Sequence, residues 1–129
     1  MPTLTIETNV TTTDFRKRVT KKISLWFDQQ DIPLNHVITK FYDIVPDHIF
    51  SGPFPFDQFP KTLPEEVSFA FITCQIAHNR SPQFRRELAR KLLDVIQPEI
   101  PQDRIFISFQ LVDPALHFMG ATLVVNGKE

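Results

Sequence analysis

Polar and apolar residues follow two successive patterns along this chain, and both have the same order. In the first, residues 3–8 alternate polar and apolar side chains, which predicts a half-buried strand. An amphipathic helix follows, with apolar residues at helical spacing: Phe15, Val19, Ile23, Trp26 and Phe27. Pro33 ends this helix, and residues 37–44 are β-branched and aromatic enough to predict a second strand.

The second pattern predicts the same elements again. Residues 67–77 form a largely apolar strand, Ser81 suits a helix N-cap and Pro82 suits the first helical position. The apolar stripe of this helix consists of Phe84, Leu88, Leu92 and Val95 or Ile96. Residues 104–112 are the last predicted strand. A strand, a helix and a strand joined by short links favour a right-handed crossover with parallel strands.

The two patterns also share residues, which indicates a duplication. F-R-K-R-V-T-K-K at 15–22 matches F-R-R-E-L-A-R-K at 84–91, and D-I-P-L-N-H-V-I-T-K-F at 31–41 matches E-I-P-Q-D-R-I-F-I-S-F at 99–109. The first pair is offset by 69 residues and the second by 68, so a single one-residue gap aligns them. Two copies with so long a period exclude a solenoid and favour one pseudo-symmetric domain.

The predicted fold class is α+β, with duplicated β-α-β units forming a four-stranded mixed sheet that carries two helices on one face. One domain spans 1–129, with pseudo-repeats at about 1–45 and 67–113, a loop at 46–66 and a tail at 114–129. The later strands carry apolar residues at both odd- and even-numbered positions, which point to opposite faces. We therefore expect the sheet to be covered on both faces. Two helices cover only one face, so a second copy of the chain is the simplest cover for the other.

The loop at 46–66 is rich in Pro and Phe, and five of the eleven prolines lie between Pro46 and Pro64. Such a segment is unsuited to a helix or a central strand. Its phenylalanines are expected to pack on the domain, at a subunit contact or beside a pocket: Phe50, Phe54, Phe56 and Phe59. The apolar tail segment 121–125 could add a strand to the sheet edge of a neighbouring copy.

Composition narrows the function classes. The formal net charge is -1, which argues against a general affinity for nucleic acid or for an anionic membrane surface. One cysteine, Cys74, cannot form an internal disulfide, and no signal segment or bilayer-spanning run is evident, so a cytoplasmic location is expected. Inside an apolar strand, Cys74 is more consistent with a core residue than with a nucleophile. The four histidines lack the spacing of a metal site, and no cofactor-binding motif occurs.

Several motifs resemble the tautomerase superfamily. M-P-T-L-T-I-E-T-N-V at 1–10, N-R-S at 79–81 and P-Q-D-R-I-F-I-S-F at 101–109 resemble macrophage migration inhibitory factor. F-A-F-I-T-C-Q-I at 69–76 and I-S-F-Q-L-V-D-P-A-L-H-F at 107–118 are more similar to 5-carboxymethyl-2-hydroxymuconate isomerase. The resemblance covers most of the chain except the Pro- and Phe-rich loop. It implies a homotrimer without a cofactor, acting on a small anionic keto or enol acid.

The resemblance makes Pro2 the expected catalytic residue. In this superfamily Met1 is removed, and the exposed proline amine moves a proton between oxygen and carbon of an enol or dienol. An α-amino group titrates nearer neutrality than lysine does, and burial among apolar side chains would lower its pKa further. If Met1 is retained, the nitrogen is a non-basic amide. The alternative interpretation of Pro2 is an ordinary second residue of an edge strand.

Cations are needed to hold the carboxylate of such a substrate. Arg80 matches the arginine of the isomerase-like R-S pattern, and its guanidinium can bind a carboxylate through two hydrogen bonds. A solvated surface arginine is the alternative. Lys40 lies near the position of a further arginine in the isomerases.

The chain also departs from the inhibitory factor. Phe106 and Ser108 stand where that protein has its active-site tyrosine and asparagine, and Ile32 stands at its active-site lysine. A phenylalanine cannot donate a proton, so Ser108, a water molecule or Pro2 would have to do so. Two rival functions therefore stay open: a non-catalytic interaction protein that keeps the fold, and a nucleic-acid-binding domain that stacks bases on Phe106 and Phe109.

Overall fold

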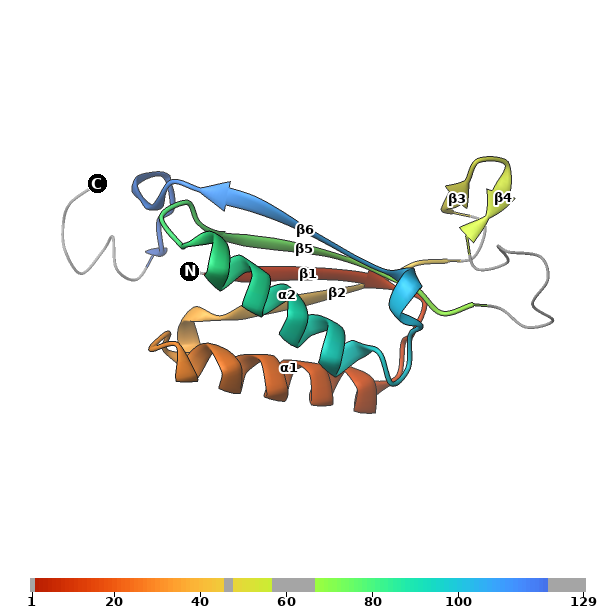
Figure 1. The fold of residues 1–129 in the computed structure, drawn as a ribbon, viewed down its shortest axis with the longest axis horizontal. Coiled ribbons are helices and arrows are strands. Elements are labelled where there is room, and N and C mark those ends of the chain that lie inside the picture. The colour runs from red at the N-terminus through yellow and green to blue at the C-terminus, as the bar shows by residue number, and fades with distance from the viewer. Residues whose placement is uncertain (1, 46–47, 57–66, 121–129) are drawn as a thin grey trace.

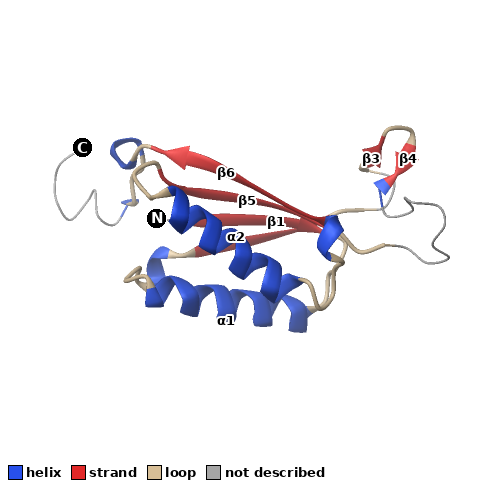
Figure 2. Ribbon diagram, viewed as in Figure 1, coloured by secondary structure: helices blue, strands red, loops and turns tan. Residues whose placement is uncertain are grey.

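The computed structural model describes residues 2–45, 48–56 and 67–120 of the chain. Its main sheet has four strands, in the order β2-β1-β5-β6: β1 (Thr3–Thr8), β2 (Ile38–Asp43), β5 (Ala70–Ala77) and β6 (Ile105–Val112). The helices α1 (Thr13–Gln29) and α2 (Pro82–Ile96) lie together on one face of this sheet (Figures 1 and 2). β1 runs parallel to β2 and β5 parallel to β6, whereas β1 and β5 are antiparallel. The predicted fold class is confirmed.

The two units are related residue by residue. Thr12 and Ser81 are the helix N-caps, and their hydroxyl oxygens accept hydrogen bonds from the backbone N–H of Phe15 and Phe84. After each helix comes a short 3₁₀ helix, at Leu34–His36 and at Gln102–Arg104, in each case preceded by a proline. The matching caps and 3₁₀ helices are what a duplicated β-α-β unit would produce.

The core lies between the helices and the sheet. Leu4 and Ile6 of β1 are fully buried, and so are Val19 and Ile23 of α1 and Leu88 and Leu92 of α2. Side chains alternate along a strand, so the odd-numbered residues of β1 point to the face that carries no helix, here called the open face. Cys74 is buried in the core, as predicted.

The open face carries both polar and apolar side chains. Its middle row is polar and runs across the sheet through paired residues: Lys40, Thr5, Thr73 and Ser108. At one end of the sheet Gln75 Nε2 donates a hydrogen bond to Gln110 Oε1 at 3.0 Å, and at the other Phe71 pairs with Phe106. The apolar residues of β6 that pack against the core lie on the helix side: Ile105, Ile107 and Phe109. The cover of the open face by a second copy stays a prediction.

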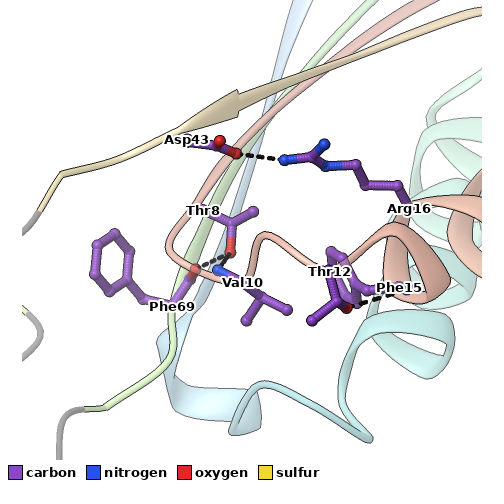
Figure 3. A network of polar contacts seen from close by, with 7 residues as sticks. All are labelled: Thr8, Val10, Thr12, Phe15, Arg16, Asp43 and Phe69. Carbon is purple, nitrogen blue, oxygen red and sulfur yellow. Dashed lines mark hydrogen bonds and ion pairs between the residues drawn. The ribbon is translucent and has the colours of Figure 1, made fainter.

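Hydrogen bonds from β1 fix where β5 begins. Thr8 Oγ1 donates to the carbonyl of Phe69 at 2.6 Å and accepts from the backbone N–H of Val10 at 3.1 Å (Figure 3). The amide of Asn9 accepts from the Phe69 N–H at 2.9 Å and donates to the Val67 carbonyl at 3.1 Å. At residues 67–69 these side-chain hydrogen bonds take the place of backbone hydrogen bonds between strands. β5 therefore begins at Ala70, three residues later than the predicted strand.

The loop between the units contains a small hairpin that the sequence did not predict. It consists of β3 (Phe50–Ser51) and β4 (Phe54–Pro55), joined through Gly52 at a positive φ of 58°. The hairpin lies at the end of the main sheet opposite to the N-terminus (Figure 1). The predicted positions of Phe59 and of the tail strand at 121–125 lie outside the described residues.

In the described part of the chain, neither helix combines the length and the apolar character that crossing a membrane requires.

Candidate functional site

Pro2 directly precedes β1 and is buried. Its carbonyl accepts a hydrogen bond from the backbone N–H of Ile38, the first residue of β2, at 3.0 Å. On the other side Thr3 pairs with Gln75, which places Pro2 beside the C-terminal part of β5. β1 is therefore an interior strand, and the interpretation of Pro2 as part of an edge strand is wrong.

Arg80 lies in the turn between β5 and α2, at the same end of the sheet as Pro2. Its backbone N–H donates to the carbonyl of Ala77 at 3.1 Å, which closes the turn. Its guanidinium carbon lies 5.0 Å from the centre of the Phe84 ring, and Phe84 packs against Trp26. Stacking uses the face of a guanidinium, whereas a carboxylate binds to its N–H edge, so the exposed Arg80 can do both.

Lys40 and Arg80 do not lie close together within one chain. It lies on β2 and pairs with Thr5, so it belongs to the middle row of the open face. Arg80 stacks on a residue of α2, on the side of the sheet that the helices cover. The two cations therefore cannot bind the same carboxylate within a single chain.

Phe106 and Ser108 lie on the open face of β6. Phe106 pairs with Phe71, and Phe71 pairs with Glu7 of β1. Phe106 is therefore level with Glu7, which lies five residues along β1 from Pro2. At about 3.3 Å per residue this is about 17 Å along the strand. The predicted site residues are thus divided between two ends of the sheet, with Pro2 and Arg80 at one and Phe106 near the other.

Phe106 and Ser108 line a hollow of about 390 Å³ on the open face. Its other walls include residues that the sequence analysis did not single out: Glu7, Ile49, Phe71 and Thr73. Alternation and register would have placed Phe71 and Thr73 beside the predicted pair, whereas Ile49 comes from the loop and had no such signal. A much smaller hollow of about 40 Å³ lies near the start of β1, between Thr3, Ala77 and His117.

The remaining candidate groups have structural explanations. Burial raises the pKa of the Cys74 thiol from 9.0 to about 12, so the thiol stays protonated and is a poor nucleophile. His78 Nε2 lies 3.7 Å from Asp113 Oδ1 near the end of β6. Within residues 2–45, 48–56 and 67–120, no three His, Cys, Asp or Glu side chains gather as a metal site requires.

The aromatic platform expected for nucleic-acid binding is not formed. Phe106 is 41% exposed on the open face, whereas Phe109 is three residues away and packs against the core on the helix side. Residues an odd number of positions apart in a strand point to opposite faces. The two rings cannot stack consecutive bases of one strand.

Comparisons with known proteins identify the fold. No family model and no curated protein matches the sequence. Solved structures do match. A fused 4-OT asymmetric trimer has a TM-score of 0.73 at 13% identity over 92% of this chain and 92% of that one. A macrophage migration inhibitory factor homologue from Prochlorococcus marinus has a TM-score of 0.68 at 19% identity over 92% and 95%.

A third match is FG41 malonate semialdehyde decarboxylase inhibited by 3-bromopropiolate, with a TM-score of 0.66 at 13% identity over 96% of this chain and 95% of that one. The chain therefore has the fold of tautomerase-superfamily structures, as the sequence resemblance implied. Identities this low establish the fold and leave the chemistry to the residues of the site.

Proposed function

We propose that this protein is a tautomerase that moves a proton between oxygen and carbon of a small anionic keto or enol acid, with the Pro2 amine as general base and acid. The observation that carries the proposal is the position of Pro2. It is buried at the start of an interior strand, in a fold shared with tautomerase-superfamily structures. Removal of Met1 would expose a secondary amine there, and low polarity disfavours its charged form.

The proposed chemistry needs one group that accepts and returns a proton. The neutral Pro2 amine takes the proton from the enol oxygen, and the resulting ammonium delivers it to the carbon, which leaves the ketone and restores the amine. Arg80, at the same end of the sheet, holds the substrate carboxylate through its N–H edge. Lys40 and Ser108 remain candidates for the substrate-binding surface of the open face.

The separation of the predicted residues supports a homotrimer. Pro2 and Phe106 lie about 17 Å apart along the strands of one chain. A second copy that brings its Phe106 end against the Pro2 end of the first would complete a site from both. Fused 4-OT trimers share the fold, which supports three copies as the assembly. Light scattering is expected to give about three times the chain mass of 15.0 kDa.

A non-catalytic interaction protein is the second candidate, and Phe106 favours it. Its ring offers no proton donor and is stacked on Phe71 with centroids 4.9 Å apart and an interplanar angle of 14°. A protein that had lost the chemistry would keep the fold and the trimer and show no turnover.

Enzyme assays separate the two candidates. Ketonisation of 2-hydroxymuconate and phenylenolpyruvate is followed with protein whose intact mass shows that Met1 is absent. Turnover of either substrate is expected, and Arg80→Ala should raise KM about tenfold or more because the carboxylate loses a charge-assisted partner. Arg86→Ala, at an exposed position of α2, is the matched control and should leave KM unchanged. Absence of turnover in Met1-free protein, or equal KM for both variants, would count against the proposal.

A further inference from the structure

The loop between the two units returns to the main sheet after the β3–β4 hairpin. Phe56 follows β4, and its backbone N–H donates a hydrogen bond to the carbonyl of Ile49 at 2.9 Å. This bond holds the segment before β3 against the segment after β4. The position of Ile49 is thus tied to that of Phe56.

Phe56 is in turn held by a cluster of aromatic rings on the open face. Its ring centre lies 5.0 Å from that of Phe69, 5.2 Å from that of Phe71 and 5.6 Å from that of Phe106. The guanidinium of Arg104, which is buried, lies 5.2 Å from the Phe56 ring centre. Edge and tilted contacts between aromatic rings are favourable beyond the area that they bury, so the three contacts together anchor Phe56 on the sheet.

The anchored loop supplies a wall of the hollow around Phe106. Ile49 lines that hollow together with the stacked rings of Phe71 and Phe106, while Ser108 and Glu7 contribute polar groups. A volume of about 390 Å³ is within the range of small-molecule pockets. Three apolar side chains from three different segments therefore converge on a space large enough for part of a ligand.

The charges of this hollow restrict what fits. Of the lining residues that the structure describes, Glu7 alone carries a formal charge, and it is negative. A second carboxylate of a substrate would meet this anion, whereas a planar apolar group would lie against two aromatic rings and an isoleucine.

We infer that Ile49 and Phe56 are specificity-determining residues: residues 48–56 of the loop build a pocket wall that selects a planar apolar group on the ligand over a second carboxylate. Ile49 makes the contact, and Phe56 is a positioning residue that acts through it. The inference rests on the proposed function in one respect, since it takes the Phe106 hollow as part of the substrate site.

Binding of unreactive probes tests this without catalysis. Cinnamate, a planar aromatic monocarboxylate, and fumarate, a dicarboxylate, are titrated into the isotope-labelled full-length protein, and NMR shifts give Kd and the residues affected. Cinnamate is expected to bind more tightly than fumarate and to shift signals of Ile49, Phe71 and Phe106. Ile49→Ala should weaken cinnamate about tenfold, the size of effect that lost apolar contact in a pocket produces.

Matched variants make the outcome specific. Phe50→Ala alters the same hairpin at a 52% exposed side chain that does not line the hollow, so cinnamate affinity should not change. Ile49→Val serves if Ile49→Ala does not fold, with about a threefold weakening expected. Phe56→Leu should weaken cinnamate while leaving fumarate unaffected. Equal affinities for the two probes, or cinnamate affinity unchanged in Ile49→Ala and Ile49→Val, overturns the inference. Loss of turnover alone concerns the proposed function and leaves this result intact.

Discussion

The ion pair between Arg18 and Glu99 is expected to stabilise the fold more than any ordinary surface pair. Arg18 Nη1 lies 2.6 Å from Glu99 Oε1, and Nη2 contacts Glu99 Oε2 and donates to the Val95 carbonyl at 2.9 Å. These bonds join α1 of the first unit to the last turn of α2 and the segment after it in the second unit. Hydrogen bonding to Glu99 raises the pKa of Arg18 above its already high ordinary value, so the guanidinium stays charged at any practical pH.

The magnitude follows from geometry and exposure. Both side chains are 31% exposed, so the pair lies between a surface pair, at about 0–1 kcal/mol, and a fully desolvated one. Two charge-assisted hydrogen bonds in a bidentate arrangement support about 1–2 kcal/mol of coupling. With a urea m-value of about 2 kcal/mol/M, losing 1.5 kcal/mol lowers the unfolding midpoint by about 0.7 M.

A double-mutant cycle measures this coupling directly. Arg18→Met, Glu99→Gln and the double variant are unfolded in urea at one protein concentration, because assembly would make the midpoint concentration-dependent. The control is the pair of Arg16, also on α1, and Asp43 of β2 (Figure 3), which has a single 2.7 Å contact and side-chain exposures of 36% and 56%. Their coupling should be about 0.3 kcal/mol. Equal coupling energies for the two pairs would refute the reasoning.

Two further predictions concern buried groups. Cys74 should resist thiol reagents at pH 8 until the protein is unfolded, and stability should fall between pH 9 and 12 by up to about 1.4 kcal/mol per pH unit, because the unfolded thiol ionises near 9.0 and the folded one near 12. Cys74→Ala should lack that slope, and rapid labelling of the native protein would contradict the assignment. Thr8→Val should cost about 1–3 kcal/mol in urea unfolding, because it leaves the Phe69 carbonyl without its 2.6 Å donor. Thr11→Val, at an exposed position, is the control, and similar stabilities of the two variants would show that this hydrogen bond contributes little.

Much of the fold could be predicted because its determinants are local. The first strand, Thr3–Thr8, and the apolar stripes of both helices follow from the periodicity of the sequence, and the cap Ser81 follows from its residue type before Pro82. The start of β5 could not be predicted, since Asn9 replaces ladder hydrogen bonds from about sixty residues away. The β3–β4 hairpin has strands of two residues, too short for any periodic signal.

The candidate site was predictable only in part, because it depends on register and on the path of a loop. Pro2 at the start of β1 follows from the sequence, but its interior place follows from pairing with both β2 and β5. Phe106 and Phe109 are three residues apart in one strand, so they point to opposite faces of the sheet. This could have been predicted from the sequence, but the two residues were expected to act together. The approach of Ile49 to Phe106 depends on how the loop returns to the sheet, which no local pattern encodes.

The central claim is that the Pro2 amine moves the proton. The most direct measurement compares kcat/KM of the wild type and Pro2→Ala for ketonisation of phenylenolpyruvate, with intact mass showing that Met1 is absent from both. Thr39→Ala, at a partly buried position of β2 that pairs with Leu4 on the helix side, controls for disturbance of the sheet around β1. A general base contributes about 10²–10⁴-fold, so Pro2→Ala should lose at least about 100-fold while Thr39→Ala stays within about threefold of the wild type. Equal kcat/KM for wild type and Pro2→Ala would contradict the account.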